Sequence, residues 1–230
     1  MSPAEELACR SYLLLPAPDG LGTALAEAYG AWAAFFASTR KFTTPGSLSV
    51  PSGYLPFCQR GGCEMKESFY AQPGLALPPL VRRATDTLVA LLLRQAAAIA
   101  ADLRLSWGAP LITETRRGCL RVMRYAAFEG EAESPLMRRL AEGGALRAGP
   151  HTDLNGLTIL PPATAPGLEI LDPDLGWRDV EPAAGRIVVH GGQELEARSA
   201  GRFRATTHRV RNPTAAEAAT PRLAFALFVS

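Results

Sequence analysis

The chain has 230 residues, enough for one domain with a full hydrophobic core, and 47% of its residues are hydrophobic. Its 24 basic and 22 acidic residues leave a net charge of +2, which gives no electrostatic case for nucleic acid or a membrane surface as a partner. The N-terminus has no basic segment followed by a long apolar core, so we expect a cytoplasmic protein.

We expect one domain over residues 1–230, whose first part, residues 1–110, is rich in helix. Leu21–Ala37 is predicted to be a helix because it is rich in Ala, Leu and aromatic residues and has few breakers. The stretch Ser38–Pro73 that follows is predicted to consist mainly of loops.

A second, longer helix is predicted over Leu77–Leu105, where two prolines mark a plausible start. Arg94 and Gln95 interrupt its apolar run before the roughly 20 residues that a bilayer span requires. The spacing of three to four residues predicts a stripe that packs against a sheet. The residues at this spacing are Leu80, Ala84, Leu88, Leu91, Leu92, Gln95, Ile99 and Leu103.

Residues 111–230 have a different pattern, with short apolar or alternating runs separated by Pro, Gly, Asn and Asp. Short strands at such close spacing favour a sandwich or a barrel. The predicted strands are Leu157–Leu160, Leu168–Ile170, Trp177–Val180, Arg186–His190, Phe203–Val210 and Arg222–Val229.

Two of the three histidines in the chain belong to a metal-binding pattern, His151-Thr152-Asp153 and, 55 residues after Asp153, His208. On a strand, His151 and Asp153 would project to the same side and Thr152 to the other. Two imidazoles and one carboxylate suit Fe(II) and leave further positions for dioxygen and an organic co-substrate. His-x-Asp is also a common tripeptide, so the motif alone does not establish a ligand pair.

The order of the motifs is similar to that of the isopenicillin N synthase-like family of 2-oxoglutarate and Fe(II)-dependent oxygenases. This resemblance implies a double-stranded β-helix, that is, a mainly β jelly-roll barrel backed by N-terminal helices, with iron near the open end. The segments that carry it are Leu120–Tyr125, His151–Leu160, Gly167–Ile170, Trp177–Val180, Gly185–His190, Gly201–Val210 and Pro221–Phe228. Family members often begin with an Ile-Pro-x-Ile-Asp strand and end with a further helix, and we expect both to be missing here.

The same resemblance assigns iron to His151, Asp153 and His208, and 2-oxoglutarate to Arg222 and Tyr125. Arg222 would hold the distal carboxylate of the keto acid through two parallel N–H donors, and Tyr125 would add a hydroxyl. This chain departs from the family at two positions. Ala224 stands where relatives have a serine that donates to the same carboxylate, and Met123 stands where they have asparagine.

The sequence thus predicts an Fe(II) and 2-oxoglutarate-dependent oxygenase that performs hydroxylation, desaturation or cyclisation on a small organic molecule or a peptide. Two alternatives stay open. One is an Fe(II) oxidase of the same fold that takes its electrons from substrate or ascorbate, and the other is a non-catalytic binding protein. His190 is open as well, either as a hydrogen-bonded structural residue or as a substrate contact. Neither the substrate nor the oligomeric state follows from the sequence.

Overall fold

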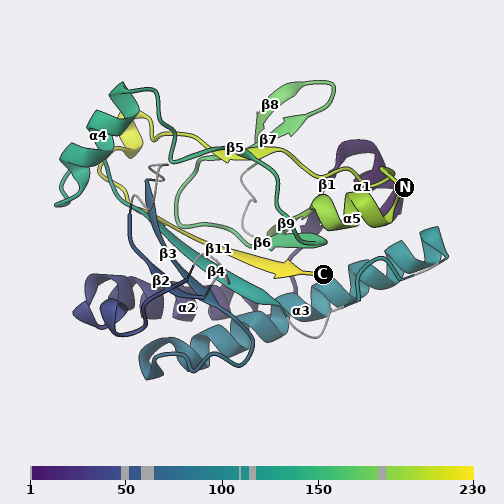
Figure 1. The fold of residues 1–230 in the computed structure, drawn as a ribbon, viewed down its shortest axis with the longest axis horizontal. Coiled ribbons are helices and arrows are strands. Elements are labelled where there is room, and N and C mark those ends of the chain that lie inside the picture. Colours follow the sequence, from purple (N-terminus) through teal and green to yellow (C-terminus); the bar gives the residue numbers. More distant parts are fainter. Residues whose placement is uncertain (1, 48–51, 58–64, 109, 114–117, 181–184) are drawn as a thin grey trace.

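Two antiparallel sheets face each other in the computed structural model, which describes residues 2–47, 52–57, 65–108, 110–113, 118–180 and 185–230 (Figure 1). This is the jelly-roll arrangement predicted from the sequence. The larger sheet has the order β1-β9-β6-β11-β4-β3-β2, and the smaller has the order β5-β10-β7-β8. The strands of the larger sheet are β1 (Tyr12–Pro16), β2 (Gly53–Leu55), β3 (Lys66–Ala71), β4 (Cys119–Tyr125), β6 (Leu157–Leu160), β9 (Arg186–Gly191) and β11 (Arg222–Val229). Those of the smaller are β5 (Ala148–His151), β7 (Leu168–Asp172), β8 (Gly176–Asp179) and β10 (His208–Val210).

Two long helices cover the outer face of the larger sheet, α2 (Leu21–Ala37) and α3 (Pro79–Trp107) (Figure 1). Both were predicted, and the bounds of α2 are those expected. The core between helices and sheet is closely packed around Trp32, which contacts Phe35, Phe36 and Phe69 with ring centroids 5.0–5.9 Å apart. Such aromatic packing fixes the helices against the sheet and leaves the opposite face of the sheet free to line the barrel.

A long apolar helix such as α3 is either a membrane-spanning helix or a helix packed in a protein core, and its contacts distinguish the two. Residues 79–104 are long and apolar enough to cross a membrane by length and composition. In the fold, however, Leu88, Leu92 and Ile99 are buried in the core that α3 shares with α2 and the sheet. The predicted stripe is wrong at its start, because Leu80 is 43% exposed and Val81 is buried in its place.

Shorter helices lie at the ends of the barrel. α1 (Pro3–Arg10) and α5 (Gln193–Arg198) lie near β1 and β9, whereas α4 (Ser134–Glu142) lies at the opposite end of the molecule (Figure 1). Two 3-10 helices, η1 (Thr39–Thr43) and η2 (Ala215–Glu217), complete the helical elements of the described residues.

Three strands correct the sequence interpretation of residues 1–110. An initial strand was expected to be missing, but β1 pairs along its whole length with β9 at the edge of the larger sheet. β2 and β3 form within the predicted loop region, and β3 pairs with β4 over Lys66–Ala71. Conversely, Phe203–Val210 was predicted to be one strand, and only His208–Val210 is extended and paired. Local composition missed β1 and β3 because their partners β9 and β4 lie far away in the sequence, and it missed β2 because three residues are too few for a strand pattern.

Candidate metal centre and cavity

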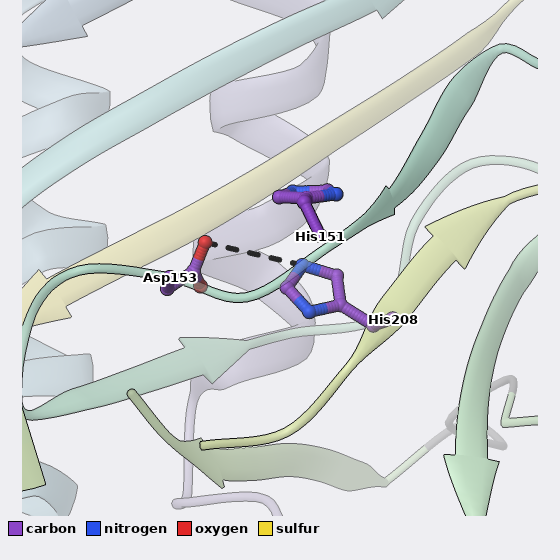
Figure 2. A group of neighbouring side chains, drawn as sticks. All are labelled: His151, Asp153 and His208. Atoms are coloured by element: carbon purple, nitrogen blue, oxygen red, sulfur yellow. Dashed lines mark ion pairs between the residues drawn. The ribbon is translucent and has the colours of Figure 1, made fainter. Parts of the chain in front are cut away.

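His151, Asp153 and His208 meet at one point between the two sheets (Figure 2). One possible ligand atom from each residue lies within 4.8 Å of the others. His151 ends β5 and His208 begins β10, and the two are direct cross-strand partners with ring centroids 4.2 Å apart. Asp153 lies beyond the end of β5 and not on the strand, so the alternation expected for residues 151 and 153 does not place it. The loop after β5 does so instead.

Hydrogen bonds orient each of these side chains. The Nδ1 atom of His151 is 2.8 Å from the Gly149 carbonyl, and Nδ1 of His208 is 3.1 Å from the Thr206 carbonyl. A carbonyl oxygen only accepts hydrogen bonds, so in each case Nδ1 carries the ring proton. The lone pair of Nε2 is then available to a metal ion. Metal-binding histidines commonly have this arrangement.

The carboxylate of Asp153 is held by Thr158 on β6. The Thr158 hydroxyl donates to Asp153 Oδ2 at 2.5 Å and accepts a bond from the Asn155 amide at 3.2 Å. Oδ1 faces His208, with 3.9 Å between Oδ1 and Nε2. Because Thr158 is fixed in the larger sheet and His208 in the smaller, the candidate metal ligands connect the two sheets.

The protonation states of His208 and Asp153 suit metal binding. Burial lowers the pKa of His208 to about 3, so its imidazole is neutral at physiological pH. Burial acts to raise the pKa of Asp153, but His190, His208 and the Thr158 hydroxyl outweigh it, and the pKa lies below its usual value. The site thus offers one anionic oxygen beside neutral nitrogen, which is the ligand set that Fe(II) takes in non-haem oxygenases.

The third histidine of the chain lies at the same site. His190 on β9 is fully buried, its Nε2 is 3.6 Å from Asp153 Oδ2, and its ring centroid is 4.7 Å from that of His208. It does not line the cavity described next. Of the two roles left open by the sequence, contact with substrate therefore finds no support.

A cavity of about 50 Å³ extends from this cluster into the barrel. Arg222 and Tyr125 line it together with the candidate metal ligands and are direct cross-strand partners on β11 and β4. Arg222 is 4% exposed, and its Nε donates to the Ala165 carbonyl at 2.9 Å, while its two terminal nitrogens make no hydrogen bond within the part of the chain that the structure describes. Among the described residues no carboxylate lies within ion-pair distance of Arg222, so a salt bridge within the chain does not explain why this charge is buried.

The two departures from the family pattern also face this cavity. Ala224 and Met123 both line it and are cross-strand partners. The Tyr125 hydroxyl is 3.6 Å from the Met123 sulfur, a weak acceptor, and is therefore able to donate to a better one. Among the described residues that line the cavity, only Tyr125 and Thr158 carry a hydroxyl.

Sequence reasoning missed two residues of the site. Lys66 lies opposite Tyr125 on β3, lines the cavity and has its Nζ 5.7 Å from the Tyr125 ring centroid. Its strand was not predicted, so nothing indicated it. Thr158 gave a usable signal, because it is the one polar residue in the buried strand Leu157–Leu160 and lies five residues after Asp153.

Residues 118–230 match the 2OG-Fe(II) oxygenase superfamily. The 2-oxoglutarate-Fe(II) type oxidoreductase hxnY of Emericella nidulans is 30% identical over 121 residues, which are 52% of this chain and 32% of that protein. The aligned segments span less than a third of the length of such curated relatives.

Solved structures extend the likeness to nearly the whole chain. The rice dioxygenase for auxin oxidation is 25% identical with a TM-score of 0.72, and the match covers 98% of this chain and 78% of that one. A Neurospora crassa protein crystallised with alpha-KG, which is 2-oxoglutarate, has a TM-score of 0.82 at 19% identity and covers 99% of this chain and 77% of its own. At that identity the second match shows the fold alone.

Proposed function

We propose that the chain, whose residues 118–230 match the 2OG-Fe(II) oxygenase superfamily, is an Fe(II)- and 2-oxoglutarate-dependent oxygenase acting on a small organic molecule. The observation that carries the proposal is the joint presence, in one cavity, of His151, Asp153 and His208 at one end and of Arg222 with Tyr125 further in. We place the chain within the isopenicillin N synthase-like group on its motifs, and we expect a cytoplasmic enzyme.

The residues present fit both groups that this superfamily uses. Asp153, His151 and His208 would hold Fe(II) with an anionic oxygen and two neutral nitrogens. The buried Arg222 guanidinium, which lacks a carboxylate of its own among the described residues, would bind the distal carboxylate of 2-oxoglutarate. Tyr125 would donate its hydroxyl to the same carboxylate. When bound, the ferrous ion and the keto acid would supply the electrons that activate dioxygen, which is the oxidant that breaks a substrate C–H bond.

The chain contributes position, charge and exclusion of water. Thr158 fixes one oxygen of Asp153, so the other oxygen keeps its direction towards His208. Arg222 sets the depth to which the keto acid enters, because its own side chain is tied to the Ala165 carbonyl. Apolar side chains line the space between these two ends and favour a substrate that presents a hydrocarbon group. They are Leu160, Pro161, Ala163, Leu168, Val210, Phe225 and Phe228.

One observation supports a second candidate function, that of an Fe(II) oxidase that does not use 2-oxoglutarate. Ala224 removes a hydroxyl that family members direct at the keto acid, a loss on the order of the 0.5–1.5 kcal/mol net value of one hydrogen bond. Arg222 is buried without a counter-charge in the described chain, and truncating one member of a buried charge pair costs about 2–5 kcal/mol. The effect at Arg222 is larger than the loss of one hydrogen bond at position 224, and it favours an enzyme that uses 2-oxoglutarate. A non-catalytic binding protein would not need three candidate metal ligands that converge.

The proposal is tested by product formation. Protein loaded with Fe(II) should convert 2-oxoglutarate and dioxygen to succinate and carbon dioxide, slowly without substrate and in the presence of ascorbate as reductant. Protein loaded with Zn(II), which has no redox chemistry, is the control. Oxygen uptake without succinate would favour the oxidase, and a protein that fails to bind Fe(II) would contradict both candidates.

A further inference from the structure

Residues 161–165 connect β6 of the larger sheet to β7 of the smaller one and carry the carbonyl that holds Arg222. The segment begins with two prolines, whose nitrogen atoms carry no hydrogen and cannot donate to a neighbouring strand. Ala163 lines the cavity on one side of the segment and an open groove of about 500 Å³ on the other. With open space on both sides, packing holds the segment weakly, so its position depends on individual hydrogen bonds.

Three hydrogen bonds join the end of this segment to the start of β11. Arg222 Nε donates to the Ala165 carbonyl at 2.9 Å. The Leu223 N–H donates to the Thr164 hydroxyl at 2.8 Å, and the Thr164 N–H donates to the Leu223 carbonyl at 3.0 Å. The position of residues 164 and 165 therefore sets the position of the Arg222 side chain.

The start of the segment is held from helix α2. The Tyr29 hydroxyl donates to the Pro162 carbonyl at 2.6 Å, a bond between residues 133 positions apart in the sequence. Only Ala163 separates Pro162 from Thr164, and the proline ring restricts the backbone, so the bond at Pro162 is coupled to those at Thr164.

Tyr29 also contacts the strand that carries Arg222. Its ring stacks on Phe225 of β11, with ring centroids 4.6 Å apart and ring planes inclined by 25°. Tyr29 itself does not line the cavity. It is thus placed to act on the inner end of the cavity from outside, through its ring on β11 and through its hydroxyl on residues 161–165.

We propose that Tyr29 is a positioning residue for 2-oxoglutarate: through residues 162–165, its hydroxyl holds the Arg222 guanidinium in the direction that receives the distal carboxylate. This inference rests on the proposed function, in which Arg222 binds the keto acid. A guanidinium binds a carboxylate through two parallel N–H donors, so the affinity depends on its direction as well as on its charge. Tyr29 therefore changes the affinity for a ligand that it does not touch.

The first test is Tyr29→Phe, which removes the hydroxyl and keeps the ring that stacks on Phe225. Affinity for 2-oxoglutarate is measured by calorimetry with Zn(II)-loaded protein. Loss of one hydrogen bond should weaken the binding of 2-oxoglutarate roughly twofold to tenfold and leave the affinity for Zn(II) unchanged. Tyr12→Phe, the same change on β1, is the matched control and should bind 2-oxoglutarate as the wild type does.

A double-mutant cycle separates positioning from a general structural role. Arg222→Lys removes the Nε that donates to Ala165, so adding Tyr29→Phe to Arg222→Lys should not weaken 2-oxoglutarate binding further. An equal loss in both backgrounds would overturn the inference, because Tyr29 would then act by a route other than Arg222.

Unchanged affinity for 2-oxoglutarate in Tyr29→Phe would also overturn the inference, even if the thermal unfolding midpoint fell, and would leave the proposed function intact. Failure of Zn(II)-loaded wild-type protein to bind 2-oxoglutarate would overturn the use of this co-substrate and the inference together. The two kinds of failure are therefore distinguishable.

Discussion

The two ends of the cavity are built in different ways. At the inner end, Tyr125 and Arg222 sit on β4 and β11, which pair without interruption from Arg222–Tyr125 to Phe228–Cys119. At the metal end, β5 and β10 share only two residue pairs with a register shift between them, and Asp153 lies in a loop. One end is fixed by a long ladder in a packed sheet, the other by short pairings and single hydrogen bonds.

This difference indicates which parts of the site exist before ligands bind. The larger sheet, backed by α2 and α3, fixes the inner end through its own core packing. The metal end joins residues of both sheets, so a bound ion would complete it. Changes at the metal end should therefore alter metal affinity first, and changes at the inner end should alter keto acid affinity while metal binding persists.

The largest effect is expected at Asp153, because this carboxylate is the one anion among the candidate metal ligands. Asp153→Ala should abolish succinate formation and greatly reduce the iron content of the protein. Iron content and oxygen uptake should be measured together, with Asp174→Ala, an exposed carboxylate on the β7–β8 turn, as the matched control. Full activity in Asp153→Ala would remove the residue from the site.

At the inner end, Arg222→Leu should raise the apparent Michaelis constant for 2-oxoglutarate at least about tenfold, in line with the 2–5 kcal/mol cost of truncating a buried charge pair. Iron content should stay near that of wild type. Arg222→Lys keeps the charge but not the two parallel donors, so it should give an intermediate value. An unchanged constant in Arg222→Leu would support the oxidase that does not use the keto acid.

The connection between the sheets can be weakened at Thr158. Thr158→Val removes the hydroxyl that donates to Asp153 Oδ2 and should lower Fe(II) affinity about tenfold, as expected when a partner of a metal ligand is lost. Thr158→Ser keeps the hydroxyl and is the matched variant. Anaerobic Fe(II) titration of both would measure the effect, and equal affinities would mean that the hydrogen bond does not orient the carboxylate.

The smallest expected effect is an increase in the affinity for 2-oxoglutarate. Ala224→Ser restores the hydroxyl that relatives direct at 2-oxoglutarate, and a net hydrogen bond of about 0.5–1.5 kcal/mol corresponds to roughly twofold to tenfold tighter binding. Affinity for 2-oxoglutarate can be measured by calorimetry with Zn(II)-loaded protein. Unchanged binding in Ala224→Ser would show that the keto acid does not approach position 224.

Much of the fold followed from local patterns. The bounds of α2, β6 and β11 were predicted as they stand in the structure, because each is a run of uniform character bounded by breakers. β1 and β3 were not predicted, since their partners β9 and β4 are distant in the sequence, and β2 has only three residues, too few for a strand pattern. The residues of the site divide in the same way, into those predicted from a local motif and those placed by the pairing of distant strands. His151, Asp153 and His208 were predicted from a sequence motif. Lys66 was recognised only in the structure, where it is the register partner of Tyr125.

By itself the sequence determined which functional groups the site contains: two imidazoles and a carboxylate at metal-ligand spacing, and an arginine on the last strand. It could not decide the role of His190, because that depends on contacts across strands. Thr158 and His190 are register partners on β6 and β9, and both approach Asp153 Oδ2. Only the tertiary structure placed them together, since register between strands is set by the packing of whole sheets and not by the residues of any one strand.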